Sequence, residues 1–549
     1  MRNLLLATSL LALTASACTD GVGTLADPPV LKVTSPARST MREGAGQVVV
    51  QGTVTPNEVT LSPIKSVMVN NVRAVVGADG TFQATINVEP GATLINTEAQ
   101  DEKGGTASDT RSIEAGELRA PGANIENALS MAMSKNAFAK IAGAAGTMLK
   151  GTDFAPLLAP MNPIYHAGDE SGEDCLFARL YINDFKMTNA TITMVPVAGG
   201  LSFSAKLDGV DVPGRMRYAA ACLDGDNTVR VQATSVMVRG TLTVTPDGMR
   251  GFKTDLENET VQITGLNISA SGLPGAVLTI LPLDSVIQSL APMAAKMFMG
   301  PMMNNALGGL AGPKQLMVLG KTVTVEVDPS DIQFTPESGL VMLDMKMLMS
   351  GAESGRGFIF TDNGFPSMDP GQGMQLGLAD DLANSVLSQV VTAGLLNINM
   401  PQHGGSFDGS TITPTSPPMI SADPATGMMR LVLPDMTSTF TLQGRPVGKA
   451  AINATVELKI SPSNSGYGIA IELGQPVIKA NTLDDIPNET MLTDADLGKA
   501  VELALQSQIA SISALLGAIP LPTLPANLTM KNMSVSSDDG YVMMRGTLE

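Results

Sequence analysis

The stretch INDFKMTNATITMVPVAGGLSFSAKLDGVDVPGRMRY, residues 182–218, decides the fold class of this chain. Within it, apolar Leu201, Phe203, Ala205 and Leu207 alternate with mostly polar neighbours. Because successive side chains of a strand point to opposite faces, this period of two predicts a strand with one apolar face. The period of two runs from residue 176 to residue 280. We therefore expect a twisted sheet whose apolar face must be buried, and which a single helix covers only in part.

Helical patterns flank this sheet region. Apolar residues lie broadly on one side of the stretch 124–150, which predicts a helix there. A second helix is expected from residue 283 to about residue 310, kinked at Pro292 and Pro301.

The order of helix, strands and helix recurs in the second half. A helix over 380–391 is stopped by Gly394, and further strands are expected between residues 429 and 473. The pair Thr493 and Asp496 resembles a capping box at the start of another helix, and strands close the chain. The recurrence predicts two similar domains in tandem.

Two further stretches complete this part of the chain. Residues 323–360 carry strands that could bridge the two domains. Residues 401–426 are rich in Gly, Pro, Ser and Thr and are expected to form a surface loop or linker.

Residues 28–116 form a region of a different kind, with about seven short alternating strands. Asn70-Asn71 and Asp79-Gly80 stand between strands, where hairpin turns need positive φ angles. The spacing predicts a small β-sandwich. The segments PPVLKVTSPA, VVVQGTV, VNNVRAVVGADGTFQATINVEPG and AQDEKGG resemble a bacterial Ig-like domain, which implies a spacer or adhesion module. No aromatic cluster offers a sugar platform, so a spacer is the favoured interpretation.

The composition limits the functions that the chain can have. It contains 34 Met but only 2 His, 5 Tyr and no Trp, and 44% of its residues are hydrophobic. Met is a flexible filler suited to variable apolar partners, although an ordinary core poor in aromatics would have the same composition. The formal net charge of -18 argues against binding nucleic acid and against docking on anionic membranes through a basic patch.

The first residues have the pattern of an export signal. Arg2 precedes a short apolar stretch, and Ala15-Ser16-Ala17 lead directly to Cys18. This run resembles a bacterial lipobox, although Ala15 stands where Leu is commoner. An ordinary signal peptide with a stray cysteine is the alternative. We expect residues 1–17 to be a lipoprotein signal peptide, Cys18 to carry the lipid anchor, and residues 18–27 to form the tether. Thr19 after the cysteine favours the outer membrane of a bacterial envelope.

Cys175 and Cys222 are the two other cysteines. In an exported chain, two remaining cysteines are most simply interpreted as one disulfide. Zinc binding or thiol catalysis is the weaker alternative, because no histidine or third cysteine lies close enough in sequence to complete a motif.

Residues 121–549 resemble the superfamily with the tubular lipid-binding (TULIP) fold, which includes bactericidal/permeability-increasing (BPI) protein, lipopolysaccharide-binding protein and the plasma lipid transfer proteins. Four segments carry the resemblance: PGANIENALSMAMSKNAFAKIAG, the stretch 182–218, GLADDLANSVLSQVVTAGLL and LGAIPLPTLPANLTMKNMSVSSDDGYVMMRGTL. The first looks like the family's opening strand and first helix, and the third like the helix that opens its second barrel. The cysteine pair also lies where the family joins parts of its first barrel.

The resemblance implies a mainly β fold with long helices (α+β). A small Ig-like sandwich over 28–116 would precede two tandem barrels, each wrapped around a long helix and joined by a central sheet. The implied barrels are residues 121–312 and 373–549, with the connector over 313–372. Acyl chains would enter apolar pockets beneath the helices.

The expected lining residues are aliphatic, Met and Phe side chains on the predicted helices, although ordinary core packing is the simpler interpretation of each one alone. In the first barrel they are Ile125, Leu129, Met133, Phe138, Ile141, Val286, Leu290, Met293, Met297 and Phe298. In the second barrel they are Leu382, Val386, Val390, Val501 and Leu505.

One departure from the family concerns charge. Endotoxin-binding members grip phosphates with a basic tip, whereas Lys206, Arg215 and Arg217 are scattered here among acids. We therefore do not expect endotoxin binding. Neutral or zwitterionic lipids fit better.

Catalytic motifs are missing from the sequence. His166 and His403 are isolated, and neither H-E-x-x-H nor G-x-S-x-G occurs. We expect no enzyme activity, no cofactor and no metal. The leading hypothesis is a lipid-anchored envelope protein that binds, and could transfer, lipids or other apolar molecules. The alternative is a surface adhesion or scaffolding lipoprotein whose barrels are solid and whose Ig-like module does the work.

Overall fold

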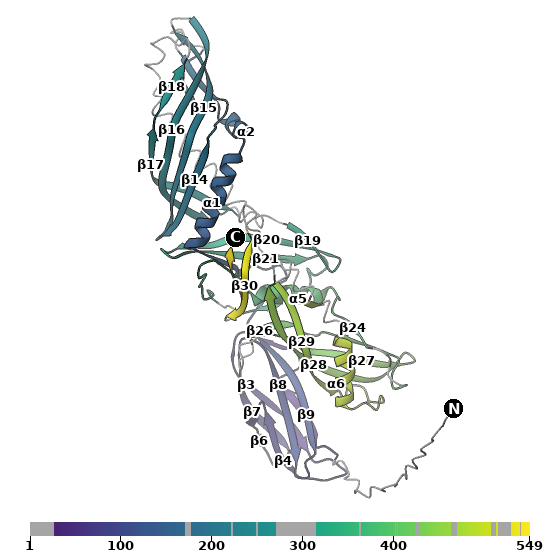
Figure 1. The fold of residues 1–549 in the computed structure, drawn as a ribbon. Helices are drawn as coiled ribbons and strands as arrows, with labels where there is room; N and C mark the ends of the chain where they lie inside the picture. Colours follow the sequence, from purple (N-terminus) through teal and green to yellow (C-terminus); the bar gives the residue numbers. More distant parts are fainter. Residues whose placement is uncertain are drawn as a thin grey trace, which may run out of the picture. The chain divides into compact units, whose positions relative to one another are not determined.

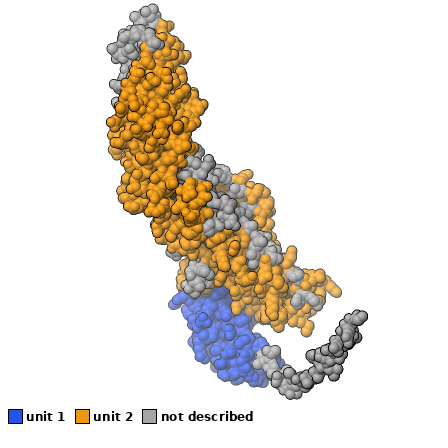
Figure 2. Space-filling view, viewed as in Figure 1, with its two compact units in different colours: residues 1–40, 46–88, 94–113 blue, residues 41–45, 89–93, 114–549 orange. Residues whose placement is uncertain are grey.

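The computed structural model describes residues 27–170, 177–220, 223–246, 248, 251–270, 314–361, 364–400, 402, 405–422, 429–462, 469–506, 512–513, 529–538 and 540–549. The described chain is mostly β, as the sequence predicts. It divides into two compact units, shown in Figure 2. Unit 1 comprises residues 1–40, 46–88 and 94–113, and unit 2 comprises 41–45, 89–93 and 114–549.

Unit 1 is built from two antiparallel sheets. One has the order β1-β3-β7-β6, and the other has the order β2-β9-β8-β4-β5. Their strands are β1 (Val30–Ser35), β2 (Thr40–Arg42), β3 (Gly46–Thr55), β4 (Ile64–Val69), β5 (Val72–Arg73), β6 (Val75–Val76), β7 (Thr81–Val88), β8 (Gly91–Asp101) and β9 (Thr106–Ala115). Most of the predicted strands are confirmed, but β2 was not expected, and residues 72–76, predicted as one strand, are divided between β5 and β6. The likeness to an Ig-like domain stays a prediction.

A central sheet joins distant parts of unit 2 in the order β19-β20-β21-β11-β23-β31-β30. Its strands are β11 (Ile125–Ser134), β19 (Lys314–Val318), β20 (Lys321–Phe334), β21 (Ser338–Met349), β23 (Met374–Ala379), β30 (Met530–Asp538) and β31 (Tyr541–Leu548). A short pair, β10 (Glu117–Arg119) and β22 (Phe358–Phe360), lies outside this sheet. Strands β20 and β21 of the stretch 323–360 therefore belong to this sheet, as does the end of the chain, while a bridge between two domains stays a prediction.

Two further sheets curl into half-barrels (Figure 1). The N-half sheet contains β12 (Tyr165–Gly168), β13 (Phe177–Ile182), β14 (Asn189–Val197), β15 (Gly200–Ala220), β16 (Leu223–Pro246), β17 (Phe252–Thr264) and β18 (Asn267–Ala270). The C-half sheet contains β24 (Ile398–Asn399), β25 (Gly409–Thr413), β26 (Met419–Ala422), β27 (Met429–Leu442), β28 (Arg445–Pro462) and β29 (Ile469–Thr482).

The described helices of unit 2 are few. They are α1 (Lys135–Gly151), α2 (Ala155–Leu158), the 3₁₀ turn η1 (Ala159–Met161), α5 (Asp380–Thr392) and α6 (Asp494–Gln506). The helices predicted over 380–391 and from Thr493 are confirmed. At α6, the hydroxyl of Thr493 donates to Asp496 at 2.7 Å, and the backbone N–H of Asp496 donates back to that hydroxyl at 3.2 Å. The helix expected over 283–310 lies outside the described residues.

The prediction of one helix over 124–150 is wrong in its first part, where β11 lies. Ile125, Leu129 and Met133 have helical spacing, but they lie in a strand that pairs with β21 on one edge and β23 on the other. The run from Ala128 to Ser134 is buried on both faces of the sheet. A strand covered on both sides is apolar throughout, so its periodicity does not distinguish it from a helix. The strand-then-helix order implied by the family resemblance agrees with the structure here.

The expected surface loop over 401–426 is also wrong in part, because β25 and β26 lie within it. Ile412, Met419 and Ile420 are buried in the core. The Gly, Pro, Ser and Thr content of this stretch is typical of a loop, so the composition did not predict these short buried strands.

Candidate functional site

A continuous apolar cluster fills much of the described interior of unit 2. It includes Phe138 on α1, Met345 and Met347 on β21, Leu382 on α5 and Val501 on α6. Aliphatic and Met side chains thus extend from the N-half sheet through the central sheet to the C-half sheet.

Helix α1 covers the N-half sheet through small residues. Its buried face includes Ala142, Ala145 and Gly146, and it packs against β14 (Figure 1). A Cβ atom on Gly146 would stand 2.9 Å from the carbonyl oxygen of Ala190, so helix and strand are in close contact there. The opposite face of α1 is exposed, including Met148.

The N-half sheet is much longer than the helix that covers it. Strand β15 has 21 residues, and at about 3.3 Å per residue it spans about 70 Å. Helix α1 has 17 residues, and at about 1.5 Å per residue it spans about 25 Å. Gly209, at φ 59°, interrupts the alternation of β15, so its buried residues are odd-numbered up to Leu207 and even-numbered from Val210 to Tyr218. The apolar face therefore continues well beyond α1.

The described lining candidates are all buried in the continuous cluster. Ile125, Leu129 and Met133 lie on β11, and Phe138 and Ile141 lie on α1.

The candidates of the second half lie on two helices. Leu382, Val386 and Val390 belong to α5, and Val501 and Leu505 belong to α6. Val286, Leu290, Met293, Met297, Phe298 and the cysteines Cys18, Cys175 and Cys222 lie outside the described residues. That any of these side chains contacts a ligand stays a prediction, as does the disulfide.

Helix α5 carries a polar clamp that the sequence reasoning missed. Its residues from Asp380 to Val390 are all buried. Asn384 donates to the carbonyl of Ile420 at 3.1 Å and accepts the N–H of Ile420 at 2.6 Å. Gln389 donates to the carbonyl of Met347 at 2.9 Å and accepts the N–H of Met349 at 2.6 Å. These amides tie α5 to the C-half sheet and the central sheet.

Three basic residues that the sequence singles out in the N-half sheet are paired with neighbouring acids. Lys206 pairs with Asp208 at 2.9 Å. Arg215 pairs with Asp226 at 3.5 Å. Arg217 pairs with Glu170 at 3.0 Å. None of these three cations forms part of a free basic cluster, in line with the scattered charges of the sequence.

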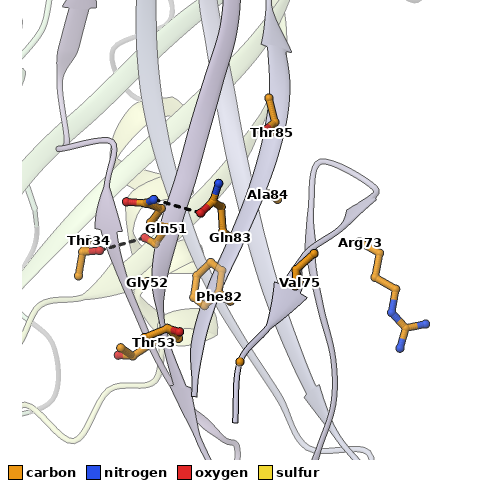
Figure 3. A pocket seen from close by; sticks show the side chains of 12 residues that line it. Thr34, Gln51, Gly52, Thr53, Arg73, Val75, Phe82, Gln83, Ala84 and Thr85 are labelled. Atoms are coloured by element: carbon orange, nitrogen blue, oxygen red, sulfur yellow. Dashed lines mark hydrogen bonds between the residues drawn. The ribbon is translucent and has the colours of Figure 1, made fainter. Parts of the chain in front are cut away.

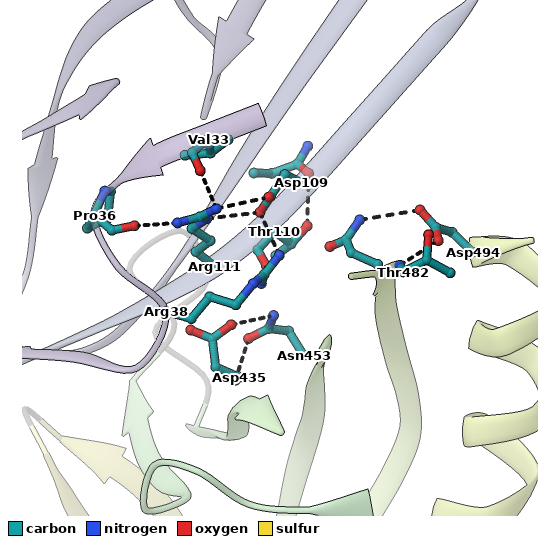
Figure 4. A network of polar contacts seen from close by, with 12 residues as sticks. Val33, Pro36, Arg38, Asp109, Thr110, Arg111, Asp435, Asn453, Thr482 and Asp494 are labelled. Carbon is teal, nitrogen blue, oxygen red and sulfur yellow. Dashed lines mark hydrogen bonds and ion pairs between the residues drawn. The ribbon is translucent and has the colours of Figure 1, made fainter. Parts of the chain in front are cut away.

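Several carboxyl groups are buried, beginning with Glu114 near the end of β9. Burial raises the pKa of Glu114 to about 8, with the nearby hydroxyl of Ser416 and then the positive charge of Arg356 opposing that shift. Neither carboxyl oxygen of Glu114 has a hydrogen-bond partner among the described residues. Burial, followed by the charge of Asp380, also raises the pKa of Asp381. Figure 4 shows a third buried acid, Asp435, whose backbone N–H donates to the side-chain oxygen of Asn453 at 2.8 Å.

Unit 1 contains an open groove of about 790 Å³ (Figure 3). Its lining is mostly polar and includes Gln51, Arg73, Gln83 and Thr85. Elsewhere in this unit, the guanidinium groups of Arg38 and Arg111 hold Asp109 at 2.9 and 3.2 Å, which ties the start of the unit to β9 (Figure 4).

Metal sites, catalytic histidines and membrane-spanning helices are the other features to consider in the described part of the chain. No group of three or more His, Cys, Asp or Glu residues there could hold a metal ion. His166 is exposed on β12, and His403 lies outside the described residues. Among the described helices, none has the length and apolar character needed to cross a membrane.

Comparisons with known proteins give only distant likenesses. No family model and no curated protein matches the chain. The crystal structure of lipopolysaccharide binding protein aligns with 77% of this chain and 99% of its own, at 13% identity and a TM-score of 0.39. The crystal structure of P47 of Clostridium botulinum E1 aligns with 77% of this chain and 100% of its own, at 9% identity and a TM-score of 0.25. At these TM-scores, neither likeness decides the family or the ligand of this chain.

Proposed function

We propose that unit 2 binds lipid or other apolar molecules along the apolar face of the N-half sheet, beside and beneath helix α1. The observation that carries this proposal is the length of that face, about 70 Å along β15 against about 25 Å of helix α1. A helix of this length leaves much of the sheet to be covered by other apolar groups. The acyl chain of a lipid is one such group.

The chemistry of the interior suits an uncharged, flexible ligand. Burying an alkyl chain against aliphatic and Met side chains is favourable by about 25 cal/mol per Å² of apolar surface. The side chains of the cluster, such as Leu207 and Val238, offer no directional polar contacts. Because the nearby arginines are already paired with acids, we propose a ligand whose head group carries little net charge.

The test is the lipid content of the soluble protein, prepared with Cys18→Ser to remove the proposed acylation site. Native mass spectrometry should show apolar molecules retained by the purified chain, and the emptied chain should take up a fluorescent phosphatidylcholine. A chain that carries nothing and takes up nothing contradicts the proposal.

A matched pair of variants locates the ligand. Ala205 is buried on β15, and Ser202 is exposed on the opposite face of the same strand. Ala205→Phe should fill interior space and lower lipid uptake at least threefold, whereas Ser202→Phe should leave uptake unchanged. Equal uptake by both variants would place the ligand elsewhere.

We propose further that the protein is an envelope lipoprotein, anchored through Cys18, with no catalytic step of its own. The wild-type chain expressed in a Gram-negative host should sediment with the outer membrane, and Cys18→Ser should release it. The groove of unit 1 favours the second candidate function, a surface scaffold, which predicts binding to other proteins and no lipid uptake.

A further inference from the structure

Strand β7 of unit 1 has one side that is only partly paired. On one side, β3 pairs with β7 along its whole length, from Gly46 opposite Val88 to Thr53 opposite Thr81. On the other side, β6 is two residues long and pairs only with Phe82 and Gln83. The rest of β7 is therefore an edge of the sheet.

The direction of the free backbone groups follows from one hydrogen bond. The N–H of Gly77 donates to the carbonyl of Thr81 at 2.7 Å, on the side of β6. Because every second residue of a strand directs its N–H and C=O to the same side, those of Thr85 and Asn87 also point that way. Among the described residues, neither Thr85 nor Asn87 has a hydrogen-bond partner on that side.

The groove of about 790 Å³ lies over the outer face of this sheet and reaches the edge at Thr85 (Figure 3). Its lining runs from Thr34 of β1 and Gln51 of β3 across Gln83 and Thr85 of β7 to Val75 of β6, and Arg73 of β5 also lines it. A segment paired with the edge would therefore lie beside polar side chains, and β6 limits the free part of the edge to the residues after Gln83.

The charge beside this edge indicates what kind of segment would fit. Arg73 is exposed, and its guanidinium donates a long hydrogen bond of 3.5 Å to the carbonyl of Lys65. No acid pairs with this guanidinium among the described residues. An acidic side chain at the edge would find an available partner there.

We propose that an extended, acidic segment of a partner protein adds to the sheet of unit 1 as a strand beside Thr85 and Asn87. Its backbone would bond to the free groups of these two residues, and an Asp or Glu of the segment would pair with Arg73. Addition of a strand to an exposed sheet edge gives affinity through the backbone and specificity through side-chain contacts. The partner is recognised by this chemistry and not by one fixed sequence.

The free edge is tested first, by hydrogen exchange on the full chain without added ligand. The amides of Thr85 and Asn87 should exchange at least a hundredfold faster than those of Ala84 and Ile86, which point toward β3. Slow exchange at all four would overturn the proposal. Protection of Thr85 and Asn87 that grows with protein concentration would show that a second copy occupies the edge, which also overturns it.

The segment is tested with a displayed library of random nine-residue peptides selected on the full chain. Enriched peptides should contain Asp or Glu, and their binding should slow the exchange of Thr85 and Asn87. Thr85→Pro removes one N–H on the open side without touching the bonds to β3, so it should weaken binding about tenfold. Thr85→Ala keeps that N–H and should bind like the wild type, whereas Arg73→Glu should lose the acidic peptides. Selection of no peptide, or equal binding by Thr85→Pro and Thr85→Ala, would refute the inference.

Discussion

Helices α1 and α5 occupy corresponding places in the two halves of unit 2 but are held in different ways. Helix α1 buries one face, mostly of Ala and Gly, and exposes the other. Helix α5 is buried from Asp380 to Val390, and its amides bond to backbone groups of neighbouring strands. The two halves therefore share an order of elements without sharing the forces that fix their helices.

The difference indicates which half can admit a ligand. Lifting α1 from β14 exposes apolar surface, a loss that a bound lipid would itself compensate. Lifting α5 leaves buried backbone groups of Ile420, Met347 and Met349 without partners, which a lipid tail cannot restore. The N-half is suited to opening, whereas the C-half is built as a fixed core.

The largest expected effect concerns the pH dependence of stability. It arises from Glu114 of β9, which lies near Ser416 and Asp435 of that fixed core. The pKa of Glu114 is about 8 in the folded chain, against a usual value of 4.5. Between these values the folded state keeps a proton that the unfolded state releases, so stability falls as the pH rises. We expect a loss of about 4 kcal/mol between pH 5 and pH 8 from this group, measured by urea unfolding.

Glu114→Gln supplies the control, because a neutral amide cannot lose a proton. The variant should lose much less stability over the same range and should be more stable than the wild type at pH 8. Part of the decrease in unfolding free energy with rising pH should remain, since the pKa of Asp381 is raised as well. An unchanged slope would mean that Glu114 is already charged in the folded protein.

A somewhat smaller effect is expected from the clamp. Asn384→Leu removes both hydrogen bonds to Ile420 and leaves a buried N–H and C=O unpaired, at a cost of about 3 kcal/mol. Urea unfolding monitored by circular dichroism would measure the loss. Asn136, which is exposed on α1, provides the matched position. Asn136→Leu should cost less than about 1 kcal/mol, and equal losses would remove the distinction between the two helices.

The same contrast shows what the sequence can and cannot disclose. The alternation around Leu201 and the pattern over 380–391 are local, so the strands of the N-half and helix α5 could be predicted. The burial of Asn384 and Gln389 is not local, because it depends on strands up to about forty residues away. One signal was present: after Asp381 the polar residues of this helix carry no charge, which is unusual for a solvated face.

The lining of the site illustrates the same limit. Phe138 and Leu382 could be identified as interior residues from their spacing on helices. Ile125 and Leu129 are also interior, but they lie in a strand whose two faces are both buried, so its apolar residues have no diagnostic period. The open edge at Thr85 depends on the shortness of β6, whereas the alternation over residues 72–76 predicts one longer strand.

The smallest effect tests the close contact of α1 with β14, using two glycines of one helix. Gly143 is exposed with no atom within 4 Å of an added Cβ, so Gly143→Ala should stabilise the chain by about 1 kcal/mol through helix propensity. At Gly146 the added Cβ would meet the carbonyl of Ala190, so Gly146→Ala should destabilise the chain by about 1 kcal/mol despite the same gain in propensity. Thermal unfolding of both variants measures the difference in sign.

If α1 is the part that opens, Gly146→Ala should also speed the release of a fluorescent lipid while Gly143→Ala does not. Stabilisation by both substitutions would show that α1 is not held as closely as its contact with Ala190 indicates.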